Sequence, residues 1–185
     1  MSGLGNKLIT SKQLIAETGL LASTFALMES AFPADERRKS TNWVEQLGYA
    51  NFHLWALPHP DRTIIAFLSW WEWDDLRFVE HFAVNERFRG LGNGSKLFGM
   101  FLEHVQKTVL LEVEPPVNNL SIRRIEFYKR HGMNLLDIAY QQPPYHVEYK
   151  PKDMLLMCSS AAQMLTIQTW VKLIHNEVYC PKLLE

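Results

Sequence analysis

The sequence has few cysteines and no excess of either charge. Its 185 residues include two cysteines, Cys158 and Cys180, and no CxxC pair. Two cysteines cannot build a disulfide framework, so we expect a reduced, cytoplasmic protein. Lys and Arg (19) nearly balance Asp and Glu (20). This balance argues against a nucleic-acid partner, because such a partner requires a basic surface.

Two further absences narrow the class of protein. The longest apolar stretches are far shorter than the roughly 18–20 residues that cross a membrane, so we expect no membrane partner. The seven histidines show no HExxH or similar spacing, so we expect no metal site. An apolar share of 47% with 21% charged residues is typical of a globular chain. Because there is also no repeat or linker, we expect a single domain, 1–185.

The hydrophobic pattern predicts an α/β fold with a mixed sheet. Helices are expected at 20–28, 35–47, 95–107, 121–131 and 163–178, the last within a C-terminal helical segment, 161–180. Strands are expected at 52–57, 63–73, 76–84, 109–113, 135–140 and 154–158. The second and third of these strands form a predicted hairpin, because Asp74 and Asp75 interrupt a β-branched and aromatic run.

A glycine-rich corner separates the strand at 76–84 from the helix at 95–107. Its sequence is Arg87-Phe88-Arg89-Gly90-Leu91-Gly92-Asn93-Gly94. Glycines let the backbone turn tightly and approach a ligand closely. The N–H groups of a helix start favour an anion by roughly 0.3–1 kcal/mol, and up to ~2 kcal/mol in a partly buried site. With Arg87 and Arg89 beside them, these groups suit a pyrophosphate.

Other phosphate-binding motifs fit the corner less well. A Walker A loop needs Gly-Lys-Ser/Thr after its second glycine, and the Rossmann fingerprint needs a glycine where Ser95 stands. The alternative without any ligand is an ordinary strand-to-helix connection with solvated arginines.

The corner resembles the acetyl-CoA signature of the GNAT superfamily of N-acetyltransferases. That signature is Arg-x-x-Gly-x-Gly between a strand and a helix, matched here by Arg87, Gly90 and Gly92. The strand end Glu80-His81-Phe82-Ala83-Val84 is similar to the fourth strand of that fold. The segment Phe127-Tyr128-Lys129-Arg130-His131-Gly132-Met133 is similar to its late Phe-Tyr-x-x-x-Gly-Phe helix. The resemblance covers roughly 32–145 and implies a twisted, mostly antiparallel mixed sheet flanked by helices.

The resemblance implies acetyl-CoA as the cosubstrate, without a metal. It assigns cofactor binding to one stretch of chain: Phe82, Ala83, Val84, Arg87, Arg89, Gly90, Leu91, Gly92, Asn93, Gly94 and Ser95. One position departs from the family pattern. Many members carry Asn seven residues before the helix tyrosine, where this chain has Ser121, which puts a side-chain contact to the cofactor arm in doubt.

The resemblance also implies direct attack of an amine on the thioester within a ternary complex. Glu80 is the candidate proton acceptor, because many members carry Glu or His there, and a structural ion pair is the alternative. His81 is expected on the opposite sheet face, because side chains alternate along a strand. Tyr128 is the candidate donor to the departing thiolate, since the reference pKa is near ~10 for a phenol and ~8.5 for a thiol. The alternative for Tyr128 is packing alone.

The acceptor, a small-molecule or peptide amine, is not identified by the sequence. Glu36 and Tyr145 are candidate contacts for it, whereas Asp35 to Arg38 is otherwise expected to be a solvated helix start. Two readings compete with an enzyme. One is a non-catalytic domain that binds or senses acyl-CoA, and the other is a protein-interaction domain that binds no CoA. The oligomeric state is left open, with a homodimer among the alternatives.

Overall fold

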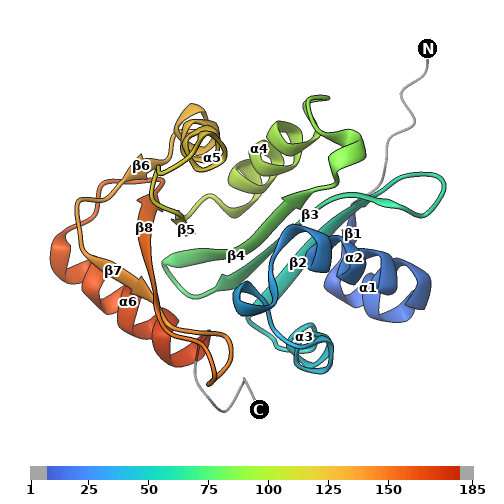
Figure 1. Cartoon of the computed structure of the whole chain (residues 1–185), viewed down its shortest axis with the longest axis horizontal. Helices are drawn as coiled ribbons and strands as arrows, with labels where there is room; N and C mark the ends of the chain where they lie inside the picture. The colour runs from blue at the N-terminus through green and yellow to red at the C-terminus, as the bar shows by residue number, and fades with distance from the viewer. Residues whose placement is uncertain (1–7, 180–185) are drawn as a thin grey trace.

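The computed structural model describes residues 8–179, which form a twisted sheet with helices on both faces (Figure 1). The strand order is β1-β2-β3-β4-β5-β8-β6, and β7 also pairs with β8. Only β4 and β5 are parallel; the other pairs are antiparallel, which confirms the expected mixed, mostly antiparallel sheet. The strands are β1 (Ile9–Thr10), β2 (Phe52–Pro58), β3 (Ile64–Glu72), β4 (Leu76–Val84), β5 (Thr108–Val113), β6 (Asn134–Leu135), β7 (Tyr140–Gln142) and β8 (Lys152–Cys158).

The helices divide between the two faces of the sheet. One face is covered by α4 (Asn93–Val105) and α5 (Asn119–Arg130), and we call it the α4 face. The other is covered by α1 (Ser11–Ala16), α2 (Thr18–Ala31), α3 (Ser40–Gln46) and α6 (Met164–Glu177), and we call it the α6 face. Figure 1 shows α4 and α5 together, away from α1, α2 and α3. No helix between residues 8 and 179 is long and apolar enough to cross a membrane.

Side-chain alternation along the strands builds a separate core on each face. In β3, Phe67 and Trp71 pack on the α6 face, whereas Leu68 and Trp70 pack on the α4 face. All four side chains are almost completely buried. The sheet is therefore covered on both sides, which explains why β3 is a nearly continuous apolar run.

The expected helix at 35–47 is wrong in its first half. The chain forms a 3-10 turn, η1 (Ala34–Glu36), and then runs extended before α3 begins at Ser40. Within the extended stretch, Arg38 is 2% exposed, so it is not part of a solvated helix start. Its guanidinium binds Glu80 in the core, and a buried partner for an arginine gives no local signal in the sequence.

The expected strand at 135–140 is also wrong, because it consists of two short strands. Residue Leu135 of β6 pairs with Met157, and Tyr140 of β7 pairs with Met154, so the two strands meet different parts of β8. Leu136 still donates a backbone hydrogen bond to the Leu156 carbonyl, but the residues between the two strands form no paired ladder with β8. Elsewhere, the expected helices and strands are found with their ends displaced by a few residues, and β1 and α1 were not predicted.

Candidate functional site

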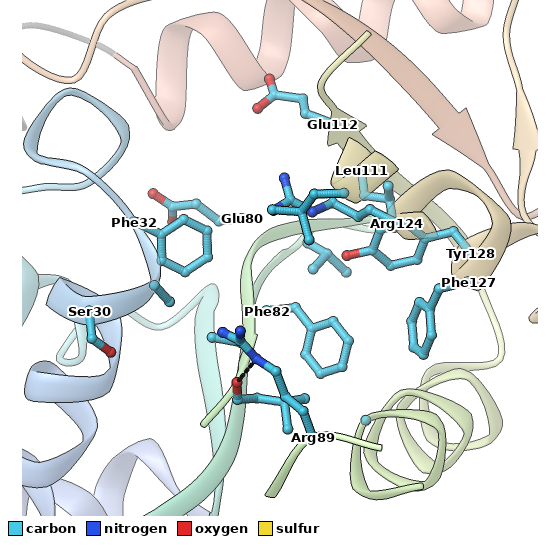
Figure 2. A pocket seen from close by; sticks show the side chains of 16 residues that line it. Ser30, Phe32, Glu80, Phe82, Arg89, Leu111, Glu112, Arg124, Phe127 and Tyr128 are labelled. Carbon is cyan, nitrogen blue, oxygen red and sulfur yellow. Dashed lines mark hydrogen bonds between the residues drawn. The ribbon is translucent and has the colours of Figure 1, made fainter. Parts of the chain in front are cut away.

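The sheet opens between β4 and β5. These strands pair from Leu76 opposite Thr108 to Val79 opposite Leu111, and their pairing ends there. A cavity of about 520 Å³ lies at this gap (Figure 2). It is lined by Ser30, Ala31, Phe32, Val79, Glu80, Phe82, Ala83, Val84, Arg89, Gly94, Leu111, Glu112, Leu120, Arg124, Phe127 and Tyr128. The cavity thus receives side chains from both faces of the sheet.

A β-bulge lies in β4 beside the gap. His81 pairs with Ser69 and Val79 pairs with Trp70, so Glu80 is the extra residue. The bulge interrupts the alternation, and Glu80 and His81 both lie on the α6 face with 3.9 Å between Oε1 and Nδ1. The expectation that they point to opposite faces is therefore wrong, because strict alternation requires an unbroken ladder. His81 is buried, and this burial lowers its pKa despite the nearby Glu80 carboxylate.

The Glu80 carboxylate is enclosed by hydrogen-bond donors. Its side chain is 0% exposed and pairs with the guanidinium of Arg38. The Gln46 amide and the Trp71 indole each donate to Oε2 at 2.7 Å, and the Tyr145 hydroxyl donates to Oε1 at 3.2 Å. Burial alone would raise the pKa of Glu80, but Arg38, His81 and the donors outweigh it and lower the pKa. This carboxylate is therefore ionised and already supplied with partners.

A second carboxylate, Glu112 of β5, lines the same cavity. Its oxygens accept hydrogen bonds from the hydroxyls of Tyr140 and Tyr179 and from the Gln142 amide. No cation pairs with it among the described residues. Burial raises the pKa of Glu112 to about 7, against the opposing effect of its three donors. Glu112 can therefore exchange a proton near neutral pH, unlike Glu80.

Tyr128 reaches the cavity from the α4 face. Its ring packs between Phe98 and Phe127, each at a centroid distance of 5.2 Å. Figure 2 shows the hydroxyl turned toward the cavity, and no described residue hydrogen-bonds to it. Burial raises the pKa of Tyr128 to about 12, so the hydroxyl keeps its proton at physiological pH. The gap thus has a hydroxyl donor on one side and the Glu112 carboxylate on the other.

The glycine corner continues this cavity along the start of α4. A neighbouring hollow of about 590 Å³ shares Val84, Arg89, Gly94 and Phe127 with the first. The remaining residues that line it are Phe88, Gly90, Gly92, Asn93, Ser95, Ile122, Arg123, Glu126 and Arg130. Three arginines and one glutamate therefore face a helix N-terminus, and this combination favours a polyanion.

Two glycines in the corner have clear structural reasons. Gly92 precedes α4 with φ of 77°, and a Cβ added there would meet no atom within 4 Å. A Cβ added at Gly94 would lie 3.1 Å from Cγ2 of Val84, so the helix start packs directly on β4. The backbone is thus open above Gly92 and tight beneath Gly94, which fits a ligand lying over the N–H groups of the helix.

Most of the predicted cofactor residues line one of the two hollows, but two do not. Arg87 is 62% exposed at its side chain and lies 3.9 Å from the Asp61 carboxylate. Leu91 is 69% exposed. Arg89 lines both hollows and donates from Nε to the Val84 carbonyl at 3.1 Å. All the predicted cofactor contacts stay predictions; of the two predicted arginines, Arg89 lines the hollows and Arg87 does not.

The two predicted acceptor contacts do not line either hollow. The Glu36 carboxylate binds Lys152 at 2.8 Å. The backbone carbonyl oxygen of Glu36 lies 3.0 Å from Nε2 of His81. Tyr145 is 1% exposed and stands behind Glu80. Both roles stay predictions, since each residue contacts the surroundings of the cavity and not its surface.

Sequence reasoning missed several residues of the site. Glu112 left a usable signal, because it is the one charged residue in a strand whose neighbours are apolar, and a buried charge needs partners. Arg38, Gln142 and Tyr179 left none, because their partners are far away in the sequence. Ser121 is buried and caps α5 together with Asn118. No group of His, Cys, Asp or Glu suited to a metal occurs within 8–179.

Comparison with known proteins identifies the family. The model of the acetyltransferase (GNAT) family matches residues 21–133. A solved structure from Bacteroides thetaiotaomicron, described as a GNAT-family acetyltransferase, is 30% identical with a TM-score of 0.79, covering 88% of this chain and 94% of that one. No curated protein sequence matches. The chain belongs to the GNAT acetyltransferase family.

More distant solved structures share the fold. The ribosomal-protein-S18-alanine N-acetyltransferase of Escherichia coli is 18% identical with a TM-score of 0.60, covering 85% of this chain and 96% of that one. An aminoglycoside 6'-N-acetyltransferase complexed with coenzyme A is 14% identical with a TM-score of 0.58, covering 77% and 92%. At these identities the likeness shows the architecture alone.

Proposed function

We propose that this protein transfers an acetyl group from acetyl-CoA to an amine by direct attack in a ternary complex. The observation that carries the proposal is the gap between β4 and β5. There, Tyr128 from the α4 face and Glu112 from the α6 face border one cavity beside the glycine corner. A thioester in the gap would have its leaving sulfur on one side and the attacking amine on the other.

The cofactor half of the proposal rests on the hollow at the start of α4. The N–H groups after Gly92 and the side chains of Arg89, Arg123 and Arg130 would hold the pyrophosphate. The cofactor arm would then run past Val84 and Phe82 to the bulge. The edge of β4 beyond Val79 has no pairing with β5, so its backbone groups, apart from the Val84 carbonyl that Arg89 binds, are available to the arm. Acetyl-CoA supplies the activated acetyl group.

The proton acceptor in this proposal is Glu112. A primary amine with a pKa near ~10.4 is almost wholly protonated at pH 7, a handicap of roughly 4–5 kcal/mol. A carboxyl with a pKa of about 7 can accept that proton at neutral pH and release it again. Glu80 was the candidate from the sequence. The cation of Arg38 and the three other donors to Glu80 favour the alternative, a structural ion pair.

The donor at the leaving group is Tyr128. Its hydroxyl faces the cavity and has its proton free for a new partner. We propose that it hydrogen-bonds to the sulfur as negative charge develops there, and this is the role of a general acid. Because burial raises its pKa to about 12, complete transfer from the free protein is uphill, and the hydrogen bond is the main contribution.

The acceptor class is only partly indicated. One structural neighbour acts on a protein alanine and another on an aminoglycoside, so the fold accommodates both peptide and small-molecule amines. In this chain, the wall of the cavity at Glu112 carries a carboxylate without a paired cation among the described residues, whereas the charge of Glu80 is paired with Arg38. This wall favours an acceptor that arrives as an ammonium ion.

The test is a screen of amines and peptide N-termini with acetyl-CoA, with release of the free thiol as the readout. Gly92→Ala is the binding variant, because its Cβ would enter the open space above the helix start. Gly132→Ala is the matched control, with φ of 81°, equally open space and no part in either hollow.

We expect calorimetry to show CoA binding weakened at least tenfold in Gly92→Ala and unchanged in Gly132→Ala. Equal affinities in both variants would contradict the pyrophosphate site. Binding without thiol release for any amine would favour a sensor of acyl-CoA. Failure to bind CoA would favour an interaction domain.

A further inference from the structure

A buried chain of hydroxyl groups joins the two carboxylates of the site. Tyr179, just after α6, donates to Glu112 at 2.8 Å. The Tyr145 oxygen lies 3.5 Å from the Tyr179 oxygen and 3.2 Å from Oε1 of Glu80. The Gln142 amide lies 3.0 Å from the Tyr179 oxygen. Tyr179 and Tyr145 are 3% and 1% exposed, so bulk water does not replace these contacts.

The hydrogen bonds are complete when Glu112 is ionised. Each tyrosine hydroxyl has one proton to give and can accept as well. Tyr179, Tyr140 and Gln142 then donate to Glu112, and Tyr145 donates to Glu80. Every proton of the chain has an acceptor in this state.

The hydrogen bonds can also be complete when Glu112 carries a proton. The Tyr179 hydroxyl can turn, accept a hydrogen bond from the protonated Glu112 carboxyl and donate its own hydrogen bond to the Tyr145 oxygen. Tyr145 keeps its donation to Glu80, which stays ionised because Arg38 is paired with it. The change needs only a rotation of one O–H bond, because all oxygens are already within 3.5 Å.

We infer that Tyr179 and Tyr145 are positioning residues that let Glu112 gain and lose a proton without losing its hydrogen bonds. Their role in turnover rests on the proposed function, in which the O–H bond formed on Glu112 replaces an N–H bond of the amine. The proton equilibrium of Glu112 itself does not depend on that function. Tyr179 also makes the C-terminal segment part of the site, although it lies beyond the matched residues 21–133.

Other charged groups near Glu112 do not offer the same exchange. Tyr140 of β7 donates to it but has no second hydrogen-bond partner among the described residues. His175 of α6 stands against the Tyr140 and Tyr179 rings at 5.6 and 6.5 Å. Across the cavity, α5 presents Tyr128 and Arg124, and Arg124 pairs with Glu114 at 2.7 Å. Within residues 8–179, the chain of hydroxyl groups passes from Tyr179 through Tyr145 and ends at Glu80 of β4.

The inference predicts pKa changes of opposite sign for two similar substitutions. Tyr179→Phe removes a donor to the carboxylate, so the pKa of Glu112 should rise by about one unit. Tyr145→Phe leaves the ionised state of Glu112 intact but removes the onward acceptor for Tyr179. The protonated state then loses a hydrogen bond, and the pKa should fall by about half to one unit.

The experiment is a carbon-13 NMR titration of the free protein labelled at glutamate carboxyl carbons. Glu112→Gln assigns the resonance by its loss. Tyr140→Phe is the matched control, since it removes a donor without an onward acceptor and should only raise the pKa. The double variant Tyr145→Phe/Tyr179→Phe should have the pKa of Tyr179→Phe alone, because without Tyr179 the loss of Tyr145 has no route to Glu112.

An unchanged or raised pKa in Tyr145→Phe would overturn the inference. If that variant does not fold, the wild type gives the answer through tyrosine labelled at Cζ. The Tyr145 resonance should then move with the pKa of Glu112, and a constant resonance would overturn the inference. The titration uses neither acetyl-CoA nor an amine, so its outcome is separate from that of the amine screen.

Discussion

At the scale of the residue, Glu80 and Glu112 show how surroundings decide what a carboxylate can do. Both are enclosed and both accept several hydrogen bonds. Only Glu80 has a cation beside it, Arg38, and the cation keeps its pKa low. Without one, burial prevails at Glu112 and its pKa approaches 7. The arginine therefore keeps Glu80 ionised, whereas Glu112, which lacks such a partner, can gain and lose a proton.

Tyr128→Phe tests the donor at the leaving group. The variant keeps the ring contacts with Phe98 and Phe127 and removes only the hydroxyl. We expect turnover with an accepted amine to fall at least 100-fold, within the range of general acid catalysis. Affinity for CoA and thermal stability should be unchanged. Tyr149→Phe, at a 39% exposed position outside the cavity, is the control. Equal turnover in the two variants would leave Tyr128 as a packing residue.

The sequence indicated some of these residues and not others for a physical reason. Tyr128 lies in a local sequence motif. The glycine corner is a run of adjacent residues that together allow a tight turn and a close approach to a ligand, so both features could be predicted. The contact between Tyr179 and Glu112 spans 67 residues, and no local pattern records it. The burial of Arg38 was missed for the same reason, because its partner Glu80 is 42 residues away.

At the scale of the element, the ion pair at the bulge connects separate segments of the chain. Glu80 of β4 receives donors from α3 through Gln46, from β3 through Trp71 and from the loop before β8 through Tyr145. Arg38 extends the connection by donating to the Val178 carbonyl after α6. Glu80, the bulge residue, thus links several segments of the chain that pack on the α6 face.

Glu80→Gln should therefore destabilise the protein. Arg38 and Glu80 have side-chain exposures of 2% and 0%, so the variant leaves a buried cation without its anion. We expect the free energy of unfolding to fall by about 3 kcal/mol, as for other broken buried pairs. Glu114→Gln is the control, because its pair with Arg124 is 39% and 38% exposed and should contribute less than about 1 kcal/mol. The measurement is urea unfolding of both variants.

The same variant also decides between the two carboxylates in catalysis. Under conditions where Glu80→Gln is folded, we expect the pH profile of its turnover to keep the wild-type shape and to move to lower pH, because the charge of Glu80 no longer raises the pKa of Glu112. A loss confined to neutral pH and recovered at high pH would instead assign proton acceptance to Glu80, as the sequence first indicated.

The elements themselves could be predicted well wherever periodicity alone determined them. β4, α4 and α5 have clear apolar patterns and lie close to their expected bounds. The bulge could not be predicted, because it depends on how β4 pairs with Ser69 and Trp70 of β3. The split of β6 from β7 likewise depends on where each meets β8.

At the scale of the whole molecule, the site reaches beyond the family core. Residues 21–133 match the family model. Outside them, β7 supplies Gln142, the loop before β8 supplies Tyr145, and the segment after α6 supplies Tyr179. The expected C-terminal helix is confirmed as Met164–Glu177. That the chain forms one domain over 1–185 stays a prediction, since 1–7 and 180–185, with Cys180, lie outside the described residues.

Glu112 should make stability fall as pH rises. Its pKa is about 7 in the folded protein and 4.5 as the ordinary value. The unfolded chain therefore loses the proton first, so the stabilising contribution is complete below pH 4.5 and is lost as pH rises through 7. A difference of about 2.5 units corresponds to about 3 kcal/mol.

Glu112→Gln removes this dependence and is the test at this scale. Burial lowers the pKa of His53, His81 and His175, which costs stability as pH falls below 6.5 in both proteins. Subtracting the wild-type free energy of unfolding from that of Glu112→Gln at each pH cancels the contribution of the histidines. The free energy of unfolding by urea, variant minus wild type, should increase by about 3 kcal/mol from pH 4.5 to pH 8. A flat difference would mean that Glu112 ionises as easily in the fold as outside it.

The opening between β4 and β5 has a consequence for how such a protein can diversify. The groups proposed to bind the cofactor, from Phe82 to Arg130, come from one stretch of the chain and lie mostly on the α4 face. On the opposite side, the cavity is lined by the end of α2 and by Phe32, and the Glu112 that lines it is held by Tyr179 after α6; these segments are far apart in the chain. Substitutions in these separate segments would therefore change the proposed acceptor side of the cavity, while the stretch proposed to bind the shared donor remains untouched.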